Sequence, residues 1–267
     1  MQRIFIEKTN MNTKLTLATL ILSISVILGS CASQNDEPAL SEGTGTITLG
    51  VTTSTAFTKA VDESSYSNVD NYTVQILNDA GTPVKEFLYS EREEKITLNN
   101  GSYTLKAFYG TESNASRESF YVVGNTSFQV NGEPVQAVAV TCQPTCGKVK
   151  ATFASNMDEY FSDYSIVYET AALKAAGSTA VWAKGDKDPW YLKVDNAGET
   201  VTATIQCTRL SDNKTATVVR TYTLAPNKSW TLNIAPADDN GSLGIEITVD
   251  ETTDDETIDI EVPADWV

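Results

Sequence analysis

The sequence predicts an all-β protein made of two tandem antiparallel β-sandwich domains of the transthyretin-like or Ig-like kind. Two observations carry this prediction. From Gly45 onward, apolar and polar residues alternate with a period of two in one short segment after another, which is the pattern of strands with one buried face. After Pro144 the pattern starts again, so we expect the second half of the chain to repeat the plan of the first.

The most apolar segment precedes these strands. Residues 15–28 are mostly Leu, Ile, Val and Ala, a run too short to span a bilayer as a helix but of the length of a signal-peptide core. Lys14 supplies the positive charge in front of it, and Met11 is an alternative start of the chain. We therefore expect a signal peptide over residues 1–30.

This apolar run ends at a cysteine. Leu28-Gly29-Ser30-Cys31 resembles a bacterial lipobox, in which small residues admit the signal peptidase and the thiol accepts diacylglycerol. An ordinary signal peptide followed by a chance cysteine is the alternative. Each buried CH₂ of an acyl chain contributes about 0.8 kcal/mol to membrane binding, so lipidation at Cys31 predicts firm anchoring to a membrane.

Residues 31–44 are expected to form a lipidated tether. They are largely Ser, Asn, Glu, Gly and Pro, a composition typical of flexible linkers. Ala32, not Asp, follows the cysteine, which by analogy with other lipoproteins favours the outer membrane. Asp36-Glu37 resembles the surface-export signals of Bacteroidales-type lipoproteins. The sequence therefore predicts an outer-membrane protein that is lipid-anchored and exposed at the cell surface.

The first sandwich is expected over residues 45–143. Alternating segments predict strands near residues 47–51, 72–76, 96–98, 103–107 and 138–142. Asn99-Asn100-Gly101 separates two of these segments. It contains the dipeptide Asn-Gly, which predicts a tight hairpin between the two strands.

The second sandwich is expected over residues 144–267, with an inserted hairpin region at 171–217. The segment from Gly147 alternates like the segment from Gly45, and Asp163-Tyr164 matches Asn71-Tyr72. Helices are predicted only as short pieces near residues 156–161 and 170–176. Duplication of one sandwich explains these matches.

A third match supports the same duplication. Thr97-Leu98 and Ser102-Tyr103 resemble Thr223-Leu224 and Ser229-Trp230, although the turn is one residue longer in the second copy. Generic hairpins can also resemble one another over so few residues, which is the alternative to duplication.

Charge and histidine content exclude several functions. The chain carries a formal charge of −16 at pH 7, and the mature chain would keep 16 basic and 34 acidic residues, a charge of −18. Nucleic acid is therefore excluded as a partner, because phosphates need a basic surface. The chain contains no histidine, which removes Ser-His-Asp and Cys-His catalysis and the commonest transition-metal ligand. We expect no enzymatic activity, no cofactor and no metal site.

The remaining cysteines also argue against a metal site. Once Cys31 is lipidated, Cys142, Cys146 and Cys207 remain, one thiolate short of a four-cysteine zinc site. Cys142 lies in phase with apolar residues of its predicted strand, and Cys207 does the same, so buried free thiols are expected. At most one disulfide can form among the three, and the sequence does not assign it.

A series of motifs resembles a known family. The series comprises the lipobox, Thr58-Lys59-Ala60, residues 84–90 (VKEFLYS), residues 101–110 (GSYTLKAFYG), Val140-Thr141-Cys142 and Val149-Lys150-Ala151. Over most of residues 45–250 it is similar to an uncharacterised Bacteroidales lipoprotein family classed as a domain of unknown function. More loosely, the plan of a lipoprotein with two sandwiches resembles the fimbrillin-like (type V pilin) superfamily.

The looser resemblance implies a mode of assembly. Fimbrillin-like proteins are exported as lipoproteins and trimmed after a basic residue near the first strand, and a strand of a neighbour fills the groove that is left, held by backbone hydrogen bonds. Lys59 is the candidate processing residue here, but it lies after the first predicted strand. No Arg or Lys occurs between Cys31 and Lys59. This departure favours a lipid-anchored monomer or an anchoring or accessory subunit over a polymerising pilin.

An aromatic cluster is the candidate ligand-binding site. Trp182 precedes a polar loop, and Trp190 and Tyr191 follow it. Exposed rings with Asp and Lys nearby would suit a sugar, because flat apolar faces stack on it and polar groups bind its hydroxyls. The alternative is that Trp190 packs in the core, in phase with Leu192 and Val194.

The function predicted from the sequence is a non-enzymatic cell-surface lipoprotein in adhesion or fimbria-like surface assembly. Its partners would be the membrane, through the lipid at Cys31, and other surface proteins by strand addition. The alternative is a glycan-binding outer-membrane lipoprotein of an uptake system, which requires the aromatic cluster to be exposed. A glycoside hydrolase would need two carboxylates at a defined separation, and no motif here supplies them.

Overall fold

Strands dominate the part of the chain that the computed structural model describes, which is residues 42–54, 57, 64–132, 134–239, 242–251 and 254–261. The first half contains β1 (Thr44–Thr53), β2 (Thr73–Asn78), β3 (Pro83–Leu88), β4 (Ile96–Asn99), β5 (Gly101–Gly110), β6 (Ala115–Ser116), β7 (Tyr121–Val130) and β8 (Gln136–Pro144). The second half contains β9 (Cys146–Phe153), β10 (Phe161–Glu169), β11 (Ala180–Ala183), β12 (Trp190–Lys193), β13 (Glu199–Arg209), β14 (Thr215–Leu224), β15 (Ser229–Asp239), β16 (Ser242–Glu251) and β17 (Asp254–Glu261).

Helices are short, as the sequence predicts. They are α1 (Ser64–Ser67), α2 (Met157–Tyr160), α3 (Ala171–Ala175) and the 3₁₀ turns η1 (Val69–Asn71) and η2 (Tyr89–Glu91). At the start of α3 the Thr170 hydroxyl accepts a hydrogen bond from the Leu173 backbone N–H at 3.2 Å, an N-cap that satisfies one unpaired donor of the first turn. Among the described residues, no helix has the length and apolar character needed to cross a membrane.

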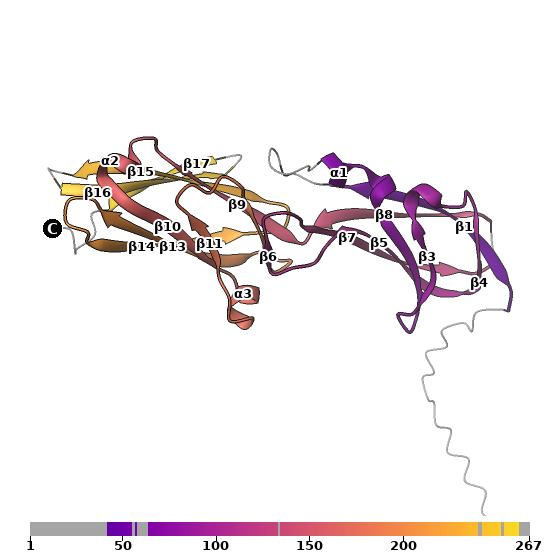
Figure 1. Cartoon of the computed structure of the whole chain (residues 1–267). Coiled ribbons are helices and arrows are strands. Elements are labelled where there is room, and N and C mark those ends of the chain that lie inside the picture. Colours follow the sequence, from indigo (N-terminus) through magenta and orange to yellow (C-terminus); the bar gives the residue numbers. More distant parts are fainter. Residues whose placement is uncertain are drawn as a thin grey trace, which may run out of the picture. The chain divides into compact units, whose positions relative to one another are not determined.

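The first sandwich is one sheet whose ends form two layers. Its strand order is β3-β2-β5-β7-β8-β1-β4. β7 and β8 pair only where Val122 and Val123 meet Pro144 and Gln143, so the sheet divides there into β3-β2-β5-β7 and β8-β1-β4. Figure 1 shows both layers.

The second sandwich consists of two separate sheets. The smaller has the order β11-β10-β13-β14, and the larger has the order β17-β16-β15-β9-β12-β6. Figure 1 shows β10, β13 and β14 in one layer and β9, β15 and β16 in the other. β6 comes from the first half of the chain and pairs with β12, where Ser116 meets Tyr191.

The two sandwiches share one topology. Without β6, β16 and β17, the second sandwich has the layers β11-β10-β13-β14 and β15-β9-β12, which correspond strand for strand to β3-β2-β5-β7 and β8-β1-β4. In each, the first strand pairs in parallel with the last, β1 with β8 and β9 with β15. The all-β prediction of two sandwiches is confirmed, although these two pairs are parallel where antiparallel sheets were expected.

This correspondence corrects two details of the sequence interpretation. Asn99-Asn100-Gly101 joins β4 to β5, but β4 pairs with β1 while β5 pairs with β2 and β7. The expected hairpin is therefore a corner between layers. The third sequence match compares β4 and β5 with β14 and β15, which are not equivalent strands, whereas the matches from Gly45 and Gly147 do compare equivalent ones, β1 and β9.

Residues 171–217 are not an insertion. They supply β11, β12, β13 and the start of β14, and β13 lies between β10 and β14. Val201, Ala203 and Ile205 of β13 are fully buried. The segment is therefore part of the second sandwich's core, because its strands have counterparts in the first sandwich.

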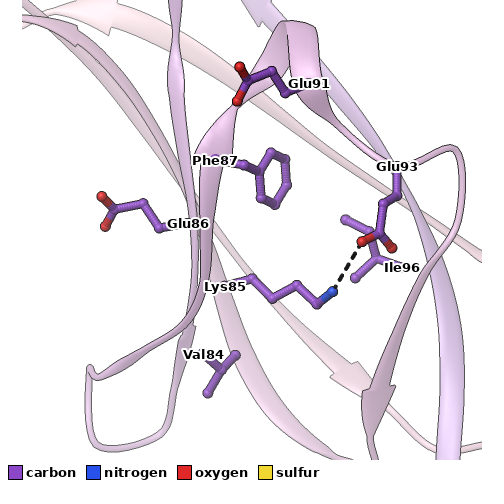
Figure 2. Close-up of a pocket in the computed structure, with 7 residues that line it drawn as sticks. All are labelled: Val84, Lys85, Glu86, Phe87, Glu91, Glu93 and Ile96. Atoms are coloured by element: carbon purple, nitrogen blue, oxygen red, sulfur yellow. Dashed lines mark ion pairs between the residues drawn. The ribbon is translucent and has the colours of Figure 1, made fainter.

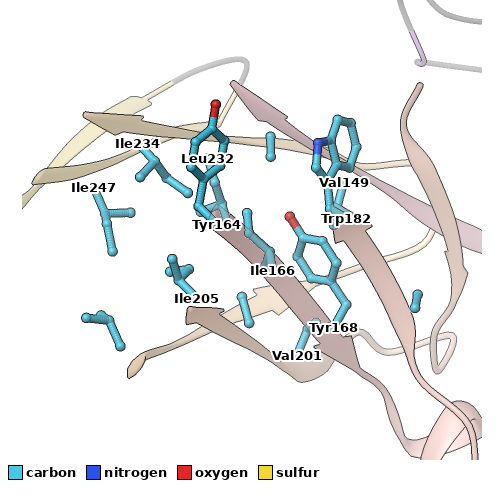
Figure 3. Packing of buried hydrophobic residues seen from close by; sticks show 14 of the residues in the cluster. Val149, Tyr164, Ile166, Tyr168, Trp182, Val201, Ile205, Leu232, Ile234 and Ile247 are labelled. Carbon is cyan, nitrogen blue, oxygen red and sulfur yellow. The ribbon is translucent and has the colours of Figure 1, made fainter. Parts of the chain in front are cut away.

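The buried side chains form two hydrophobic clusters. Cluster 1 is made of residues between positions 47 and 146, among them Ile47, Tyr72 and Leu105, and it also includes Tyr191. Cluster 2 lies between the two sheets of the second sandwich, where Tyr164, Ile166 and Tyr168 of β10 face Leu232 and Ile234 of β15 (Figure 3). Interdigitation of these inward faces is what holds each pair of layers together.

Candidate functional site

Two of the predicted functional residues cannot be placed. Cys31, the expected lipidation site, and Lys59, the candidate processing site, both lie outside the described residues. They remain predictions from the sequence. The described chain begins at Glu42, shortly before β1.

The predicted aromatic cluster is not an exposed platform. Trp182 on β11 is fully buried in cluster 2, and Tyr191 on β12 is 1% exposed in cluster 1. The rings of Phe120 and Phe57 lie 4.8 and 5.6 Å from that of Tyr191. Because successive residues of a strand point to opposite faces, Tyr191 and its neighbour Trp190 enter different surroundings.

Trp190 is only partly buried, but a cation covers it. The Arg117 guanidinium carbon lies 4.4 Å from the centre of the Trp190 ring and 5.1 Å from that of Trp182, within the range of a cation–π contact. The Trp190 indole N–H donates to the Val181 carbonyl at 2.9 Å. The ring face that a sugar would need is therefore in contact with the protein's own arginine.

Arg117 also fixes the loop between β11 and β12. Its guanidinium donates to the Asp186 carboxylate at 2.6 Å and to the backbone carbonyls of Val181 and Asp188 at 2.8 and 2.9 Å. The same carboxylate oxygen of Asp186 accepts from the Ala183 N–H at 2.7 Å. Asp186, one of the polar groups expected to hold a sugar, is thus bound by Arg117 and by the backbone of its own loop.

Sequence reasoning missed Arg117, because it lies 65 positions before Trp182 and in no alternating segment. Its position follows from β6, whose pairing with β12 brings residue 117 beside the loop. The core-packing alternative holds for Trp190, which packs partly buried against the cluster that contains Leu192 and Val194. Trp182 and Tyr191 are buried as well, so the structure gives no support to glycan binding through these rings.

The three cysteines in the described part of the chain are shielded by burial. Cys142, Cys146 and Cys207 are free and buried, as predicted for Cys142 and Cys207. Burial raises the pKa of the Cys142 thiol to about 11 and those of Cys146 and Cys207 to about 12, so the reactive thiolate form is suppressed at neutral pH. Within the described residues, no group of three or more Cys, Asp or Glu side chains is arranged to hold a metal ion.

An open cavity lies instead beside the edge strand β3. Its volume is about 380 Å³, and it is bounded by β3, the turn after η2 and the start of β4 (Figure 2). Figure 2 shows Phe87 and Lys85 pointing from β3 toward Ile96, with Glu86 on the other side of the strand. Val84 and Leu88 at the two ends of β3 are 46% and 42% exposed.

The cavity beside β3 is acidic. Glu86, Glu91 and Glu93 line it together with one cation, Lys85. The Lys85 ammonium lies 3.5 Å from a Glu93 carboxylate oxygen, and at such exposure this pair contributes little to stability. The arrangement offers an apolar floor and a negative rim, which suits contact with another molecule; it contains no nucleophile paired with a base.

Comparison with known families identifies one match. The family described as "Domain of unknown function (DUF4493)" matches residues 43–264. Among curated proteins, none matches the sequence.

The comparison with solved structures returns fimbrial proteins of low sequence identity. A fimbrial assembly protein from Parabacteroides distasonis is 10% identical with a TM-score of 0.42, and the alignment covers 82% of this chain and 99% of that one. The fimbrial anchor protein Mfa2 from Porphyromonas gingivalis is 8% identical with a TM-score of 0.46, over 82% of this chain and 100% of that one.

Proposed function

This chain belongs to the family described as a domain of unknown function, DUF4493, and we propose that it is a lipid-anchored protein of the outer cell surface with a non-enzymatic role in adhesion or fimbria-like surface assembly. The lipobox at Leu28-Gly29-Ser30-Cys31 supports the anchor. The absence of histidine supports a non-enzymatic role, since it removes the commonest catalytic base.

The observation that carries the proposal is the place of β1. This strand pairs with β4 along one edge and with β8 along the other, and its side chains Ile47 and Val51 are buried in cluster 1. Thr44, where β1 begins, follows Cys31 by 13 positions, so the tether spans at most roughly 45 Å. A lipid on Cys31 would thus attach to an interior strand of the first sandwich.

An interior first strand favours an anchoring or accessory subunit that is not cleaved. Among the described strands, β4 pairs with β1 alone. Cleavage at Lys59 would remove β1 together with the lipidated Cys31, which would release the protein from the membrane and open the edges of β4 and β8 to a neighbour's strand. The uncleaved chain keeps both the anchor and the strand, as expected for an anchoring or accessory subunit.

Blotting of native outer membranes with an antibody to this protein tests the proposal. Samples are compared with and without boiling in detergent, and with a Cys31→Ala variant. We expect one lipidated band under both conditions, and loss of that band from membranes in the variant. A heat-sensitive ladder of bands trimmed near Lys59 would instead indicate a polymerising subunit. Unchanged membrane association of the Cys31→Ala variant would disprove the lipid anchor.

A further inference from the structure

The first strands of the two sandwiches each leave part of one edge unpaired. β1 pairs with β4 only as far as Ile47, and β9 pairs with β12 only as far as Val149. Beyond these residues each strand keeps its parallel partner on the other side. Because β1 and β9 are equivalent strands, Ile47 corresponds to Val149, and residues 49 and 51 correspond to 151 and 153.

In the first sandwich this edge is closed by a side chain of the protein itself. Tyr89 is the first residue after β3. Its hydroxyl accepts a hydrogen bond from the Val51 N–H at 3.2 Å and donates to the Leu49 carbonyl at 3.4 Å. Tyr89 is 7% exposed. The phenol therefore satisfies a backbone donor and acceptor that would otherwise be buried without a partner.

The orientation of the β9 backbone follows from its other side. The N–H of Lys148 donates to the Lys228 carbonyl, and the N–H of Ala154 donates to the Ile234 carbonyl, both at 2.8 Å. Even-numbered residues of β9 thus direct their backbone groups to β15. Backbone groups of neighbouring residues point to opposite edges, so the odd-numbered residues direct theirs to the unpaired side.

The β9 free edge, defined as residues 150–153 on the side away from β15, therefore presents the N–H and C=O groups of Ala151 and Phe153. No strand of the described chain pairs with it there. A cavity of about 420 Å³ lies between this edge and the loop that follows β11. The rings of Phe153 and Tyr164, 4.5 Å apart, form its apolar wall.

The loop that could close this edge is held in place by other contacts. In the first sandwich the equivalent loop, after β3, carries Tyr89. In the second sandwich the loop after β11 carries Gly185, Asp186 and Lys187 along the cavity, and Asp186 is bound to Arg117 at 2.6 Å. The loop thus lines the cavity without supplying a group equivalent to the Tyr89 hydroxyl.

The cavity is positively charged in an acidic protein. Lys150 and Lys187 line it, and neither forms an ion pair within the described part of the chain. Its acidic residue, Asp186, is already neutralised by Arg117. An incoming carboxylate would therefore meet two ammonium groups that have no anionic partner among the described residues.

We propose that the β9 free edge is a docking site for an extended, acidic segment of another protein. The segment would add as a short strand that continues β12, exchanging backbone hydrogen bonds with Ala151 and Phe153. A carboxylate of the segment would lie between Lys150 and Lys187. This site lies in the second sandwich and is independent of the lipid anchor and of any processing at Lys59.

NMR spectroscopy of the ¹⁵N-labelled mature chain with Cys31→Ser tests the proposal. The probe is an acetylated and amidated peptide, Val-Glu-Val-Thr-Val-Glu. We expect the amide signals of Ala151 and Phe153 to shift, and exchange of the Phe153 amide with solvent to slow. The Val51 amide, already bonded to Tyr89, should not change and serves as the internal control.

Two comparisons separate strand addition from charge attraction. Reversal of both charges, Lys150→Glu with Lys187→Glu, should weaken binding by roughly fivefold or more, whereas Lys174→Glu on the exposed surface of α3 should leave it unchanged. A second peptide with proline at the two central positions keeps the charges but loses backbone donors, and it should not bind. Equal binding of the proline peptide, no shift at Phe153, or shifts at these amides with soluble oligosaccharides in place of the peptide would each overturn the proposal.

Discussion

The guanidinium carbon of Arg117 lies 4.4 Å above the ring centre of Trp190. The two residues belong to different halves of the chain, yet they meet because β6 pairs with β12. This contact, with the bonds from Arg117 to Asp186, Val181 and Asp188, determines the surroundings of the residues that the sequence marks as a ligand site.

Replacement of Arg117 should therefore destabilise the protein. In Arg117→Ala, the Asp186 carboxylate and the carbonyls of Val181 and Asp188 lose the donor that Arg117 supplies, although Asp186 keeps the Ala183 N–H. We therefore expect the free energy of unfolding to fall by about 1–3 kcal/mol. Arg117→Lys keeps the charge but not the planar fork, so it should recover only part of this loss. Denaturation by urea measures both, with Lys174→Ala as the control. A loss below about 0.5 kcal/mol in Arg117→Ala, the range of ordinary surface substitutions, would contradict the structure.

Trp182 should behave as a core residue. Its side chain is fully buried, so Trp182→Ala should lower the free energy of unfolding by about 3–5 kcal/mol. The neighbouring Val181 points to the opposite face of β11 and is 42% exposed, so Val181→Ala should change it by no more than about 0.5 kcal/mol. Thermal and urea unfolding compare the pair. Similar, small effects of the two substitutions would mean that Trp182 is exposed after all.

Gly110 should tolerate no side chain. Its φ is +84°, and a Cβ there would overlap the carbonyl oxygen of Phe120, the residue that precedes the paired strand β7. Gly81 is the matched control, because its φ is +72° but no atom lies within 4 Å of the added Cβ. Gly81→Ala should cost about 1 kcal/mol from backbone strain alone. Gly110→Ala should cost clearly more, roughly 3 kcal/mol or above; equal melting temperatures of the two variants would refute the close contact.

The turn between β13 and β14 should respond to acid. Hydrogen bonds from Arg209, at 2.9 and 2.6 Å, lower the pKa of the Asp212 carboxyl to about 2. The pKa of Asp212 in the unfolded chain is about 4, so its contribution to stability is present above that pH and is lost as the pH falls through about 2. Wild type should melt higher than Asp212→Asn at pH 6, and the difference should shrink toward pH 2. A difference that does not depend on pH would show that this carboxyl has no depressed pKa.

Much of the fold follows from local patterns in the sequence. Alternation with a period of two marks β1, β2, β9 and β10, and it also places the thiols of Cys142 and Cys207 on buried faces. The similarity between the segments that begin at Gly45 and Gly147 correctly indicates a repeated sandwich. These predictions succeed because the direction of a side chain in a strand depends on the position of the residue along that strand.

The pairing of strands could not be predicted in the same way. Asn99-Asn100-Gly101 has the composition of a hairpin turn, but it carries the chain from one layer to the other. A turn motif specifies local backbone geometry, whereas the choice of partner strand depends on which faces must be buried together. The same limit explains why the match of β4 and β5 with β14 and β15 compared strands that are not equivalent.

The sequence by itself determined the class of the protein: an all-β, acidic, histidine-free chain of two related sandwiches. The tertiary structure alone decided which residues are accessible. Trp182 and Tyr191 are residues of the kind that form a binding platform. However, Trp182 is buried in cluster 2 beneath Arg117, and Tyr191 is buried in cluster 1. Tyr89 closes the edge of β1 while the equivalent edge of β9 stays open. Both outcomes rest on contacts between residues far apart in the chain, and local composition contains no information about such contacts.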